Sequence, residues 1–321
     1  MHNQFCLNGL RSYKLKILNP NIYAIFVRYY KMENKKFSWI YLIILSLIWG
    51  SSFILMKKAL IGLTPIQVGI FRILITTAFL LLIGFKSLLK IKRRHWYYLL
   101  LNGFLGTFFP VFLFAFAVEH IDSSITSILN SLTPLSTLIF GALVFGIGFS
   151  RRQALGVFIG LIGTIMLILE GAVLNPNQNY FYAFFVLLAS IGYAFNVNII
   201  KKYLHDLNAL SIAVGNFVLL IIPTFMVMWY TDFFGTFEIN KTTTTALIYM
   251  AILAIFGTAA SKIMYNRLVQ ISSPIFSSSV TYLIPIIAIF WGLLDGEKIS
   301  FLQFLAGLIV ILGVYLANKA K

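Results

Sequence analysis

The chain has very little of what most protein chemistry depends on. Its 321 residues include a single cysteine, Cys6, so neither an internal disulfide nor a paired-cysteine metal or redox site can form. Only 11% of the residues are charged, and nine Asp and Glu are outnumbered by 25 Lys and Arg, which gives a net charge of +16. A soluble domain of this length needs far more charged surface, so the composition excludes that class.

Carboxylates and imidazoles are also missing from the long apolar stretches. All nine acidic residues and all four histidines fall at the ends of these stretches or between them. There is no HExxH sequence, no paired-aspartate motif and no glycine-rich phosphate loop, so we expect no catalytic cluster, no metal site and no cofactor. Proton coupling usually needs a titratable group inside the membrane, and Lys262 is the one internal candidate. The sequence therefore favours a facilitator or an exchanger, and a membrane enzyme is the least expected function.

Apolar residues, in contrast, dominate the chain. Sixty per cent of the residues are hydrophobic and the mean hydropathy is +0.91. A membrane-spanning helix needs about 20 mostly apolar residues. The expected fold is therefore an all-α integral membrane protein. Ten spans are predicted, at residues 39–56, 65–85, 96–117, 124–145, 153–170, 180–200, 208–230, 246–266, 273–294 and 301–318.

The distribution of Lys and Arg predicts the orientation of the spans. If both termini are cytoplasmic, most basic residues between the spans fall on the inner side, as the positive-inside rule requires. Their position favours contact with anionic lipid head groups and excludes nucleic acid as the partner. We expect a multi-pass protein of the plasma (cell inner) membrane. The outer side receives only Lys57, Lys58, Lys241 and Lys298, and topology does not explain the first two.

The sequence contains an internal repeat. The segment Leu45–Leu60 recurs in outline at Ala189–Leu204, which aligns Lys57 with Lys201. Each copy holds five predicted spans, and an odd number means that the second copy enters the membrane from the opposite side. We therefore expect two inverted repeats, with a solute site between them.

The predicted repeats cover residues 37–171 and 178–321, and residues 1–36 stand apart as a basic extension. The extension has no apolar stretch long enough to span a membrane. We expect it to be disordered or a mis-assigned start, because Met32 reads as a natural first residue just before the first span. The alternative is a basic anchor that lies in the membrane interface.

Short motifs in both repeats carry a resemblance to a known family. The first repeat has Trp49-Gly50-Ser51-Ser52-Phe53, then Lys57, Thr64-Pro65 and Phe71-Arg72, and the second has Gly296-Glu297-Lys298-Ile299-Ser300, then Gln303, Gly307 and Gly313. In order and spacing these motifs resemble the EamA family of the drug/metabolite transporter superfamily. The resemblance implies a ten-helix carrier with a central cavity and a supporting helix at the end of each repeat. One departure is that the first repeat has Gly146-Ile147 where the second has Gly296-Glu297.

Aromatic and amide side chains at mid-membrane depth are candidates for lining that cavity. Trp49 lies about 15 Å into the first span, and its repeat partner is Tyr193. The alternative for Trp49 is a packed aromatic bonded to a helix carbonyl. Asn196, which aligns with Ser52, and Asn216, which aligns with Arg72, are either solute ligands or contacts between helices.

Two embedded cations point to the kind of solute. Arg72 lies about 11 Å into the second span, and Lys262 lies near the inner end of the eighth. Such residues are costly unless they are paired or face water. Arg72 either faces the cavity or ties helix ends together, and Lys262 either faces the cavity or reaches to the inner surface. With no embedded acid, they allow an anionic or zwitterionic solute.

Prolines and small residues complete the set of candidates. Pro134 and Pro285 align inside the fourth and ninth spans, where each kinks the helix as a gate hinge or as a way to shape the cavity. Asn130 and Tyr282 stand within a turn of these prolines. They are candidate hydrogen-bond partners for the carbonyls that the prolines leave unpaired, and candidate solute contacts. Small-residue faces on the fifth and tenth spans predict close packing of these two helices, with a homodimer interface as the alternative.

Taken together, the sequence predicts a membrane carrier of a small metabolite. The expected mechanism is alternating access at a cavity between the two repeats, in the direction of efflux, for an amino acid-like, organic-anion or amphipathic solute. A channel or a structural membrane protein is the alternative. The expected partners are the solute and the lipid bilayer.

Overall fold

The computed structural model describes residues 20–146, 151–174 and 176–319 of the chain, and over these ranges it contains helices and no strands. Two compact units are distinguished, Met1–Ile40 and Tyr41–Lys321. All contacts described below lie within the second unit.

Long apolar helices make up nearly all of the described chain. Each predicted span falls on one of them, as expected for a polytopic membrane protein. A shorter apolar helix, Phe301–Gly313, coincides with the tenth span. Within the described residues nine helices are long and apolar enough to cross a membrane, namely Lys36–Ala59, Pro65–Leu88, Arg93–His120, Ser123–Phe145, Ala154–Leu174, Tyr180–Tyr203, Ala209–Tyr230, Lys241–Ile271 and Pro274–Leu294.

The first span belongs to a longer helix, α2 (Pro20–Ala59). Pro20 stands at its first position, where the missing N–H has no intrahelical partner to lose. No proline and no glycine follows before Gly50, so nothing in the sequence ends the helix earlier. Part of the predicted basic extension is thus helical from Pro20 onward, and residues 1–19 lie outside the described residues.

The third and eighth spans each contain a π-helical stretch. The third consists of η2 (Arg93–His95), α4 (Trp96–Gly103), the π-helix η3 (Phe104–Phe108) and α5 (Phe109–His120). The eighth consists of α13 (Lys241–Ile252), the π-helix η5 (Leu253–Ala260) and α14 (Ser261–Ile271). Such stretches are rare, they disturb the regular backbone hydrogen bonds, and they often occur at functional sites.

The fourth and ninth spans are interrupted near their middle. The fourth divides into α6 (Ser123–Asn130) and α7 (Thr133–Phe145), and the ninth into α15 (Pro274–Ser278), the 3₁₀-helix η6 (Ser279–Tyr282) and α16 (Ile284–Leu294).

Pro134 and Pro285 each stand near the start of the last segment of their span, Pro134 in α7 and Pro285 in α16. They therefore begin new helices, where a missing N–H costs little, rather than kinking continuous ones. Thr133 Oγ1 donates to the carbonyl of Asn130 at 2.8 Å, and Thr281 Oγ1 to that of Ser278 at 2.9 Å.

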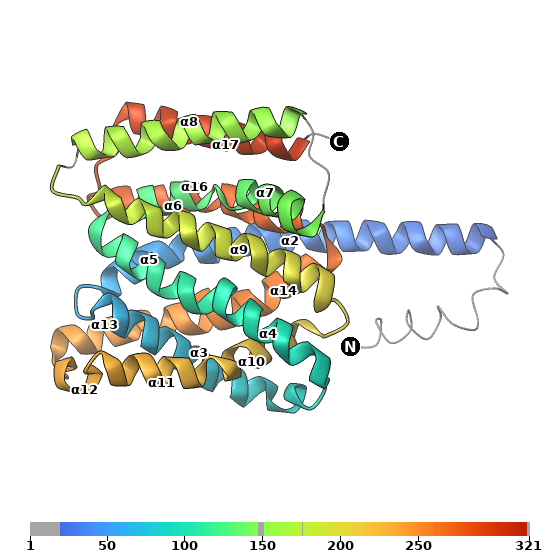
Figure 1. Cartoon of the computed structure of the whole chain (residues 1–321), viewed down its shortest axis with the longest axis horizontal. Helices are drawn as coiled ribbons and strands as arrows, with labels where there is room; N and C mark the ends of the chain where they lie inside the picture. Colours follow the sequence, from blue (N-terminus) through green and yellow to red (C-terminus); the bar gives the residue numbers. More distant parts are fainter. Residues whose placement is uncertain (1–19, 147–150, 175, 320–321) are drawn as a thin grey trace. The chain divides into compact units, whose positions relative to one another are not determined.

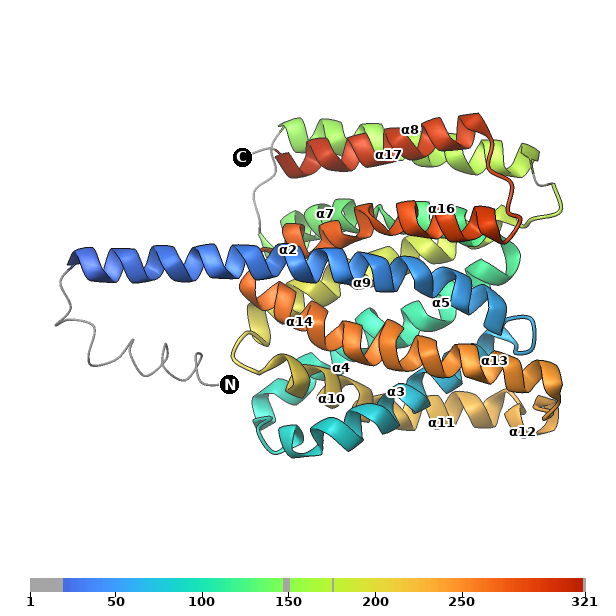
Figure 2. The same ribbon diagram turned by 180° about the vertical axis from the view of Figure 1, so that it is seen from behind.

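The fifth and tenth spans, α8 (Arg151–Leu174) and α17 (Phe301–Lys319), lie side by side along one edge of the bundle (Figures 1 and 2). A Cβ at Gly163 would lie 2.8 Å from the backbone N of Val310, and one at Gly313 would strike the backbone of Gly160. These glycines therefore let the two backbones touch within one chain, as the packing interpretation predicts. A homodimer remains a prediction that would need other faces of these helices.

The remaining spans complete the bundle around the broken helices. The element α3 (Pro65–Leu88) begins with a capping box made by Thr64 and Gln67. It packs against the seventh span, which is divided into α10 (Ala209–Leu219) and α11 (Ile221–Tyr230) and is followed by α12 (Phe233–Thr236). The sixth span, η4 (Tyr180–Tyr182) and α9 (Ala183–Tyr203), contacts α5 and α7.

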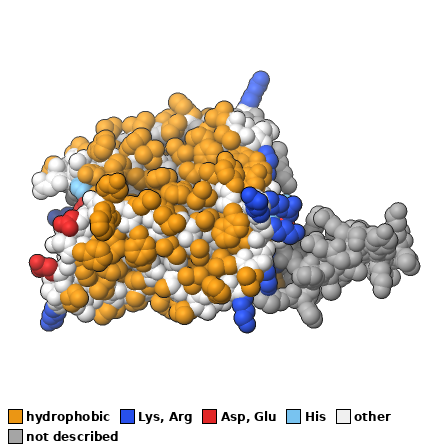
Figure 3. Space-filling view, turned by 60° about the horizontal axis from the view of Figure 1, so that its bottom comes forward, with side chains coloured by type: hydrophobic (Ala, Val, Ile, Leu, Met, Phe, Trp, Pro, Cys, Tyr) orange, Lys and Arg blue, Asp and Glu red, His pale blue; other side chains and the backbone are white. Residues whose placement is uncertain are grey.

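Apolar side chains cover the lateral face of the bundle that Figure 3 shows, with Lys and Arg gathered at one end of it and Asp and Glu at the other. Leu82 and Trp229 are 86% and 83% exposed, which a soluble surface of this extent would not tolerate. Such a girdle fits a hydrocarbon environment.

Candidate functional site

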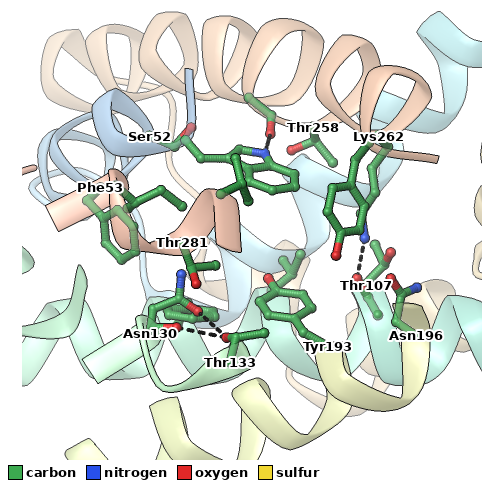
Figure 4. A pocket seen from close by; sticks show the side chains of 18 of the residues that line it. Ser52, Phe53, Thr107, Asn130, Thr133, Tyr193, Asn196, Thr258, Lys262 and Thr281 are labelled. Carbon is green, nitrogen blue, oxygen red and sulfur yellow. Dashed lines mark hydrogen bonds between the residues drawn. The ribbon is translucent and has the colours of Figure 1, made fainter. Parts of the chain in front are cut away.

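A cavity lies among the interrupted and π-helical segments (Figure 4). Its wall is formed by side chains of α2, α3, α5, α9, α14 and of the segments around η3, η5 and the two helix breaks. Most of the residues singled out from the sequence meet there, from both halves of the chain. They are Trp49, Ser52, Arg72, Asn130, Tyr193, Asn196 and Lys262.

Trp49 closes part of the wall by bonding to the π-helix η5. Its indole Nε1 donates to the carbonyl of Gly257 at 3.0 Å and to Ser261 Oγ at 2.9 Å. The ring also packs on Tyr265, with 5.1 Å between the ring centroids. Trp49 thus lines the cavity and satisfies a helix carbonyl at the same time, so both interpretations of this residue hold.

Lys262 crosses the cavity instead of reaching toward the bundle end. Its ammonium donates to the carbonyl of Gly106, in the π-helix η3 of the first half. It also lies 5.7 Å from the centroid of the Tyr193 ring, within the range of a cation–π contact. Figure 4 shows Lys262, Thr107 and Asn196 together on one side of the cavity, with Asn130 and Thr133 on the other.

Arg72 lies in the same wall. Its Nε donates to Thr258 Oγ1 at 2.8 Å, again on η5. None of the ion pairs among the described residues involves Arg72 or Lys262. No Asp or Glu lines the cavity. The cavity therefore holds two cations without a carboxylate beside them.

The amide of Asn196 is held by a residue that the sequence did not single out. Its Nδ2 donates to Asn102 Oδ1 at 2.7 Å. A Cβ at Gly106 would collide with the Asn196 side chain, so η3 approaches α9 only because that position has no side chain. The hydroxyl of Ser52 donates within its own helix, to the carbonyl of Ile48 at 2.8 Å.

Two predicted solute contacts do not line the cavity. Asn216 is buried on α10 behind Gly103, where a Cβ would lie 3.4 Å from the Asn216 carbonyl. Tyr282 packs against the small cluster formed by Leu132, Leu135 and Val310. The position of a residue along a span does not tell which helix face meets the cavity.

Threonines that the sequence analysis missed supply much of the polar wall. Thr107 and Thr258 each follow a glycine in a π-helix, Gly106-Thr107 in η3 and Gly257-Thr258 in η5. The repetition of this Gly-Thr pair in corresponding spans is the sequence pattern that could have identified both threonines as cavity residues. Thr107 is 1% exposed, and its hydroxyl has no hydrogen-bond partner among the described residues.

Away from the cavity, an ion cluster centred on the buried Glu297 joins the two halves of the chain. It lies at the bundle end where α6 begins and α16 ends, which we call the Glu297 end. Glu297 Oε1 accepts from Lys57 Nζ at 2.9 Å and from the backbone N and Oγ of Ser123 at 3.1 and 2.6 Å. Its Oε2 accepts from the backbone N and Oγ of Ser124 at 3.1 and 2.5 Å. Asp295 pairs with Lys57 at 2.8 Å and with Lys58.

We call these six residues the Glu297 cluster: Lys57, Lys58, Ser123, Ser124, Asp295 and Glu297. The cluster explains why Lys57 and Lys58 depart from the charge pattern of the loops, because both lysines pair with its carboxylates. Burial by itself would raise the pKa of Glu297, but the hydrogen bonds from Lys57, Ser123 and Ser124 outweigh it and hold the pKa below its usual value. Asp295 also has a lowered pKa, because its bonds to the two lysines outweigh burial.

Comparison with known proteins agrees with this architecture. A protein of Archaeoglobus fulgidus named "Uncharacterized transporter" is 28% identical over 86% of this chain and 95% of its own length. The Escherichia coli K12 protein named "Uncharacterized inner membrane transporter YedA" is 26% identical over 86% of this chain and 89% of its own. A second E. coli K12 protein, named "Probable amino-acid metabolite efflux pump", is 24% identical over 84% of this chain and 90% of its own.

A solved crystal structure shares the fold, with a TM-score of 0.62 at 13% identity, over 87% of this chain and 96% of the other. The model of the EamA-like transporter family matches residues 36–169 and again residues 180–319. The two matches cover nearly the whole chain, one for each half. The chain is therefore a member of the EamA-like transporter family.

Proposed function

We propose that this protein is a carrier that exports a small, carboxylate-bearing metabolite by alternating access. The observation that carries the proposal is the pair of cations, Arg72 and Lys262, in a cavity that no carboxylate lines. In the proposed arrangement both termini are cytoplasmic, the membrane is the cell inner membrane, and the Glu297 end faces outward.

The proposal includes two inverted repeats, residues 37–171 and 178–321, that move against each other around the cavity. Paired features support it. The π-helices η3 and η5 occur in corresponding spans, and each offers a Gly-Thr pair to the cavity. The fourth and ninth spans are both interrupted, and the interruptions bring Asn130, Thr133 and Thr281 to the cavity wall.

The charge of the cavity selects the solute class. A cation in the membrane interior costs several kcal/mol unless it is paired or faces water. Lys262 has only the carbonyl of Gly106 and the face of Tyr193, which leave its charge uncompensated. A carboxylate between Arg72 and Lys262 would supply the compensating negative charge, and a guanidinium such as that of Arg72 is well suited to bind a carboxylate. The unpartnered hydroxyl of Thr107 could donate to the same group.

The rest of the cavity favours a solute with an apolar part. Phe53, Val111, Phe114 and Ile284 line it beside Trp49 and Tyr193. An amino acid or a small organic acid combines a carboxylate with such a part. The name of the E. coli relative, a probable amino-acid metabolite efflux pump, agrees with this class and with the export direction.

Two measurements test the proposal. Comparison of extracellular metabolites between a deletion strain and an overexpressing strain identifies the solute. Counterflow of that solute in proteoliposomes then separates a carrier from a pore, because only a carrier shows trans-stimulation. Uptake without trans-stimulation would assign the chain to channels.

The anion specificity is tested by charge removal. Arg72→Gln and Lys262→Gln should each reduce the preference for the solute over its neutral amide by about tenfold, the factor that corresponds to about 1.4 kcal/mol. Lys202→Gln is the matched control, because Lys202 lies near Phe145 and Tyr203 at the opposite bundle end. Unchanged preference in both cavity variants, with lowered thermal stability, would make the two cations structural.

A further inference from the structure

We infer that Glu297 is a gate residue, which holds the half-helices α6 and α16 together and closes the cavity at the Glu297 end until its contacts break. The inference rests on the proposed carrier function and adds to it the residue that controls access. Neither its chemistry nor its test requires that the solute be known.

The contacts of Glu297 cross from one half of the chain to the other. The residue follows α16 in the second half, whereas Ser123 and Ser124 are the first residues of α6 in the first half. Both backbone N–H groups at the start of α6, both hydroxyls and Lys57 donate to one carboxylate. A helix N-terminus favours a negative charge, so the contact is electrostatically complementary as well.

The packing at this junction is tight. The Glu297 side chain is 1% exposed. A Cβ at Gly292 of α16 would collide with both Ser124 Oγ and the Glu297 carboxylate, so the contact between these two groups depends on the absence of a side chain at Gly292. The backbone N of Glu297 also donates to the carbonyl of Gly292 at 2.9 Å, which fixes the turn after α16.

The two half-helices that meet at Glu297 are also the ones that reach the cavity. Asn130 at the end of α6 and Ile284 at the start of α16 both line it. With a rise of about 1.5 Å per residue, the eight residues of α6 place the Glu297 end about 12 Å from the cavity wall. Separation of α6 from α16 would therefore open a short path from the cavity to this end.

At the opposite bundle end, no equivalent ion pair joins the corresponding half-helices, α7 and α15, within the residues that the structure describes. Lys201, which aligns with Lys57, donates to the carbonyls of Val269, Gln270 and Ser272, all in its own half of the chain. In the sequence, Ile147 stands where the other repeat has Glu297.

An acidic group at this opposite end, Asp206, lies on the partly exposed connection between α9 and α10. It pairs with Arg94 at 2.5 Å and with His95 at 3.1 Å. No ion pair among the described residues reaches α7 or α15. The resting carrier should therefore be closed at the Glu297 end and open more readily at the α7–α15 end.

The test uses the accessibility of the cavity from each end. A cysteine replaces Ser52 in a chain whose Cys6 is serine, and a membrane-impermeant thiosulfonate reagent is added to one side of sealed vesicles. A second sample with Asn177→Cys, in the exposed loop at the Glu297 end, shows which side that end faces.

Without further change, the Ser52→Cys thiol should react from the opposite end and slowly from the Glu297 end. Glu297→Gln should raise the rate from the Glu297 end by about ten- to hundredfold, the range that the loss of a charge-assisted hydrogen bond allows. Lys57 keeps its bond to Asp295 in this variant, so the fold should persist. If that variant nevertheless fails to fold, the double change Ser123→Ala with Ser124→Ala breaks the same contact from the other side.

Glu170→Gln is the matched control. Glu170 lies at the same bundle end and accepts from Ser300 Oγ at 3.1 Å, but it joins α8 to the segment before α17 and not α6 to α16. It should leave the labelling rates unchanged. Equal labelling from the Glu297 end with and without the Glu297 change would overturn the inference, whereas failed counterflow with altered labelling would overturn only the proposed solute transport.

Discussion

At the scale of single residues, the molecule depends on a few polar groups that meet backbone carbonyls freed by the π-helices. Trp49 donates a hydrogen bond to the carbonyl of Gly257, and Lys262 donates one to the carbonyl of Gly106. Thr76 donates one to the carbonyl of Ala254 at 3.0 Å. Buried carbonyls of this kind need partners, so these side chains hold the π-helices in place, and Trp49 and Lys262 line the cavity as well. Trp49 and Lys262 therefore combine a packing role with a place in the wall of the proposed solute site.

Gly106 provides a sharp test of this close packing. Gly106→Ala should lower the free energy of unfolding by about 1–3 kcal/mol, the usual cost of overpacking, because the new Cβ displaces Asn196 and its bond to Asn102. Solute exchange should fall with it. Thermal unfolding of the purified protein measures the first effect, and counterflow measures the second.

Gly103→Ala, three residues earlier, is the control for that change. Its Cβ would meet its nearest neighbour at 3.4 Å, which is an ordinary contact. An alanine in a helix should then stabilise the protein by about 0.5–1 kcal/mol or leave it unchanged. Equal effects of the two changes would show that the approach of η3 to α9 is not tight.

At the scale of elements, the interrupted helices set what each bundle end can do. The pair α6 and α16 is joined through the buried Glu297 carboxylate. At the opposite end, α15 is capped within its own chain segment by Ser273, whose Oγ accepts from the backbone N of Phe276 at 3.1 Å. If the carrier works by alternating access as proposed, ends held together so unequally would have unequal free energies of opening.

The Glu297 cluster should lose its stabilising effect only in strong acid. Glu297 faces Lys57 directly, Asp295 and Lys58 beyond it, and Asp122, whose pKa is raised by burial and by the Glu297 charge. Because the pKa of Glu297 in the folded protein is below the usual value of about 4.3, its contribution is complete above that pH and is lost as the pH falls through the lowered pKa.

The difference in melting temperature between the unmodified protein and Glu297→Gln measures this contribution. It should stay constant from pH 8 to about pH 5 and shrink only below about pH 4.3. A difference that already shrinks near neutral pH would mean that the carboxylate is not held as an anion by Lys57, Ser123 and Ser124.

Sequence reasoning found the helices and much of the cavity, for a physical reason. Long apolar runs with a few polar residues are a strong signal, because a polar group inside a membrane needs a partner. Arg72, Lys262 and Asn196 were recognised on that ground. The face that each residue presents was not predictable, and Asn216 and Tyr282, which were also candidates for solute contact, lie outside the cavity wall.

The π-helices and the Glu297 cluster were missed for other reasons. A π-helical stretch such as η3 depends on tertiary contacts that no local sequence pattern specifies. Glu297 and Lys57 are separated by 240 positions and both stand at span ends, where charge is ordinary. Only the folded chain shows that their charges are buried together.

At the scale of the whole molecule, the apolar girdle and the charged ends define how the bundle lies in a bilayer. The proposed orientation predicts that, in intact cells, an impermeant thiol reagent labels Asn177→Cys but not Lys90→Cys, because their loops lie on opposite sides of the membrane. Both positions are exposed, so reactivity at either thiol is limited by sidedness. The reverse labelling pattern would invert the orientation.

The uncompensated cations of the cavity have an electrical consequence. Arg72 and Lys262 stay with the protein, so under the proposed function a monoanion would carry one elementary charge across the membrane in each turnover, whereas a zwitterion would carry none. A membrane potential of 100 mV, negative inside, favours outward movement of that charge by about 2.3 kcal/mol. The voltage that a living cell already maintains would then be enough to drive export of an anion, with no second ion bound to the carrier.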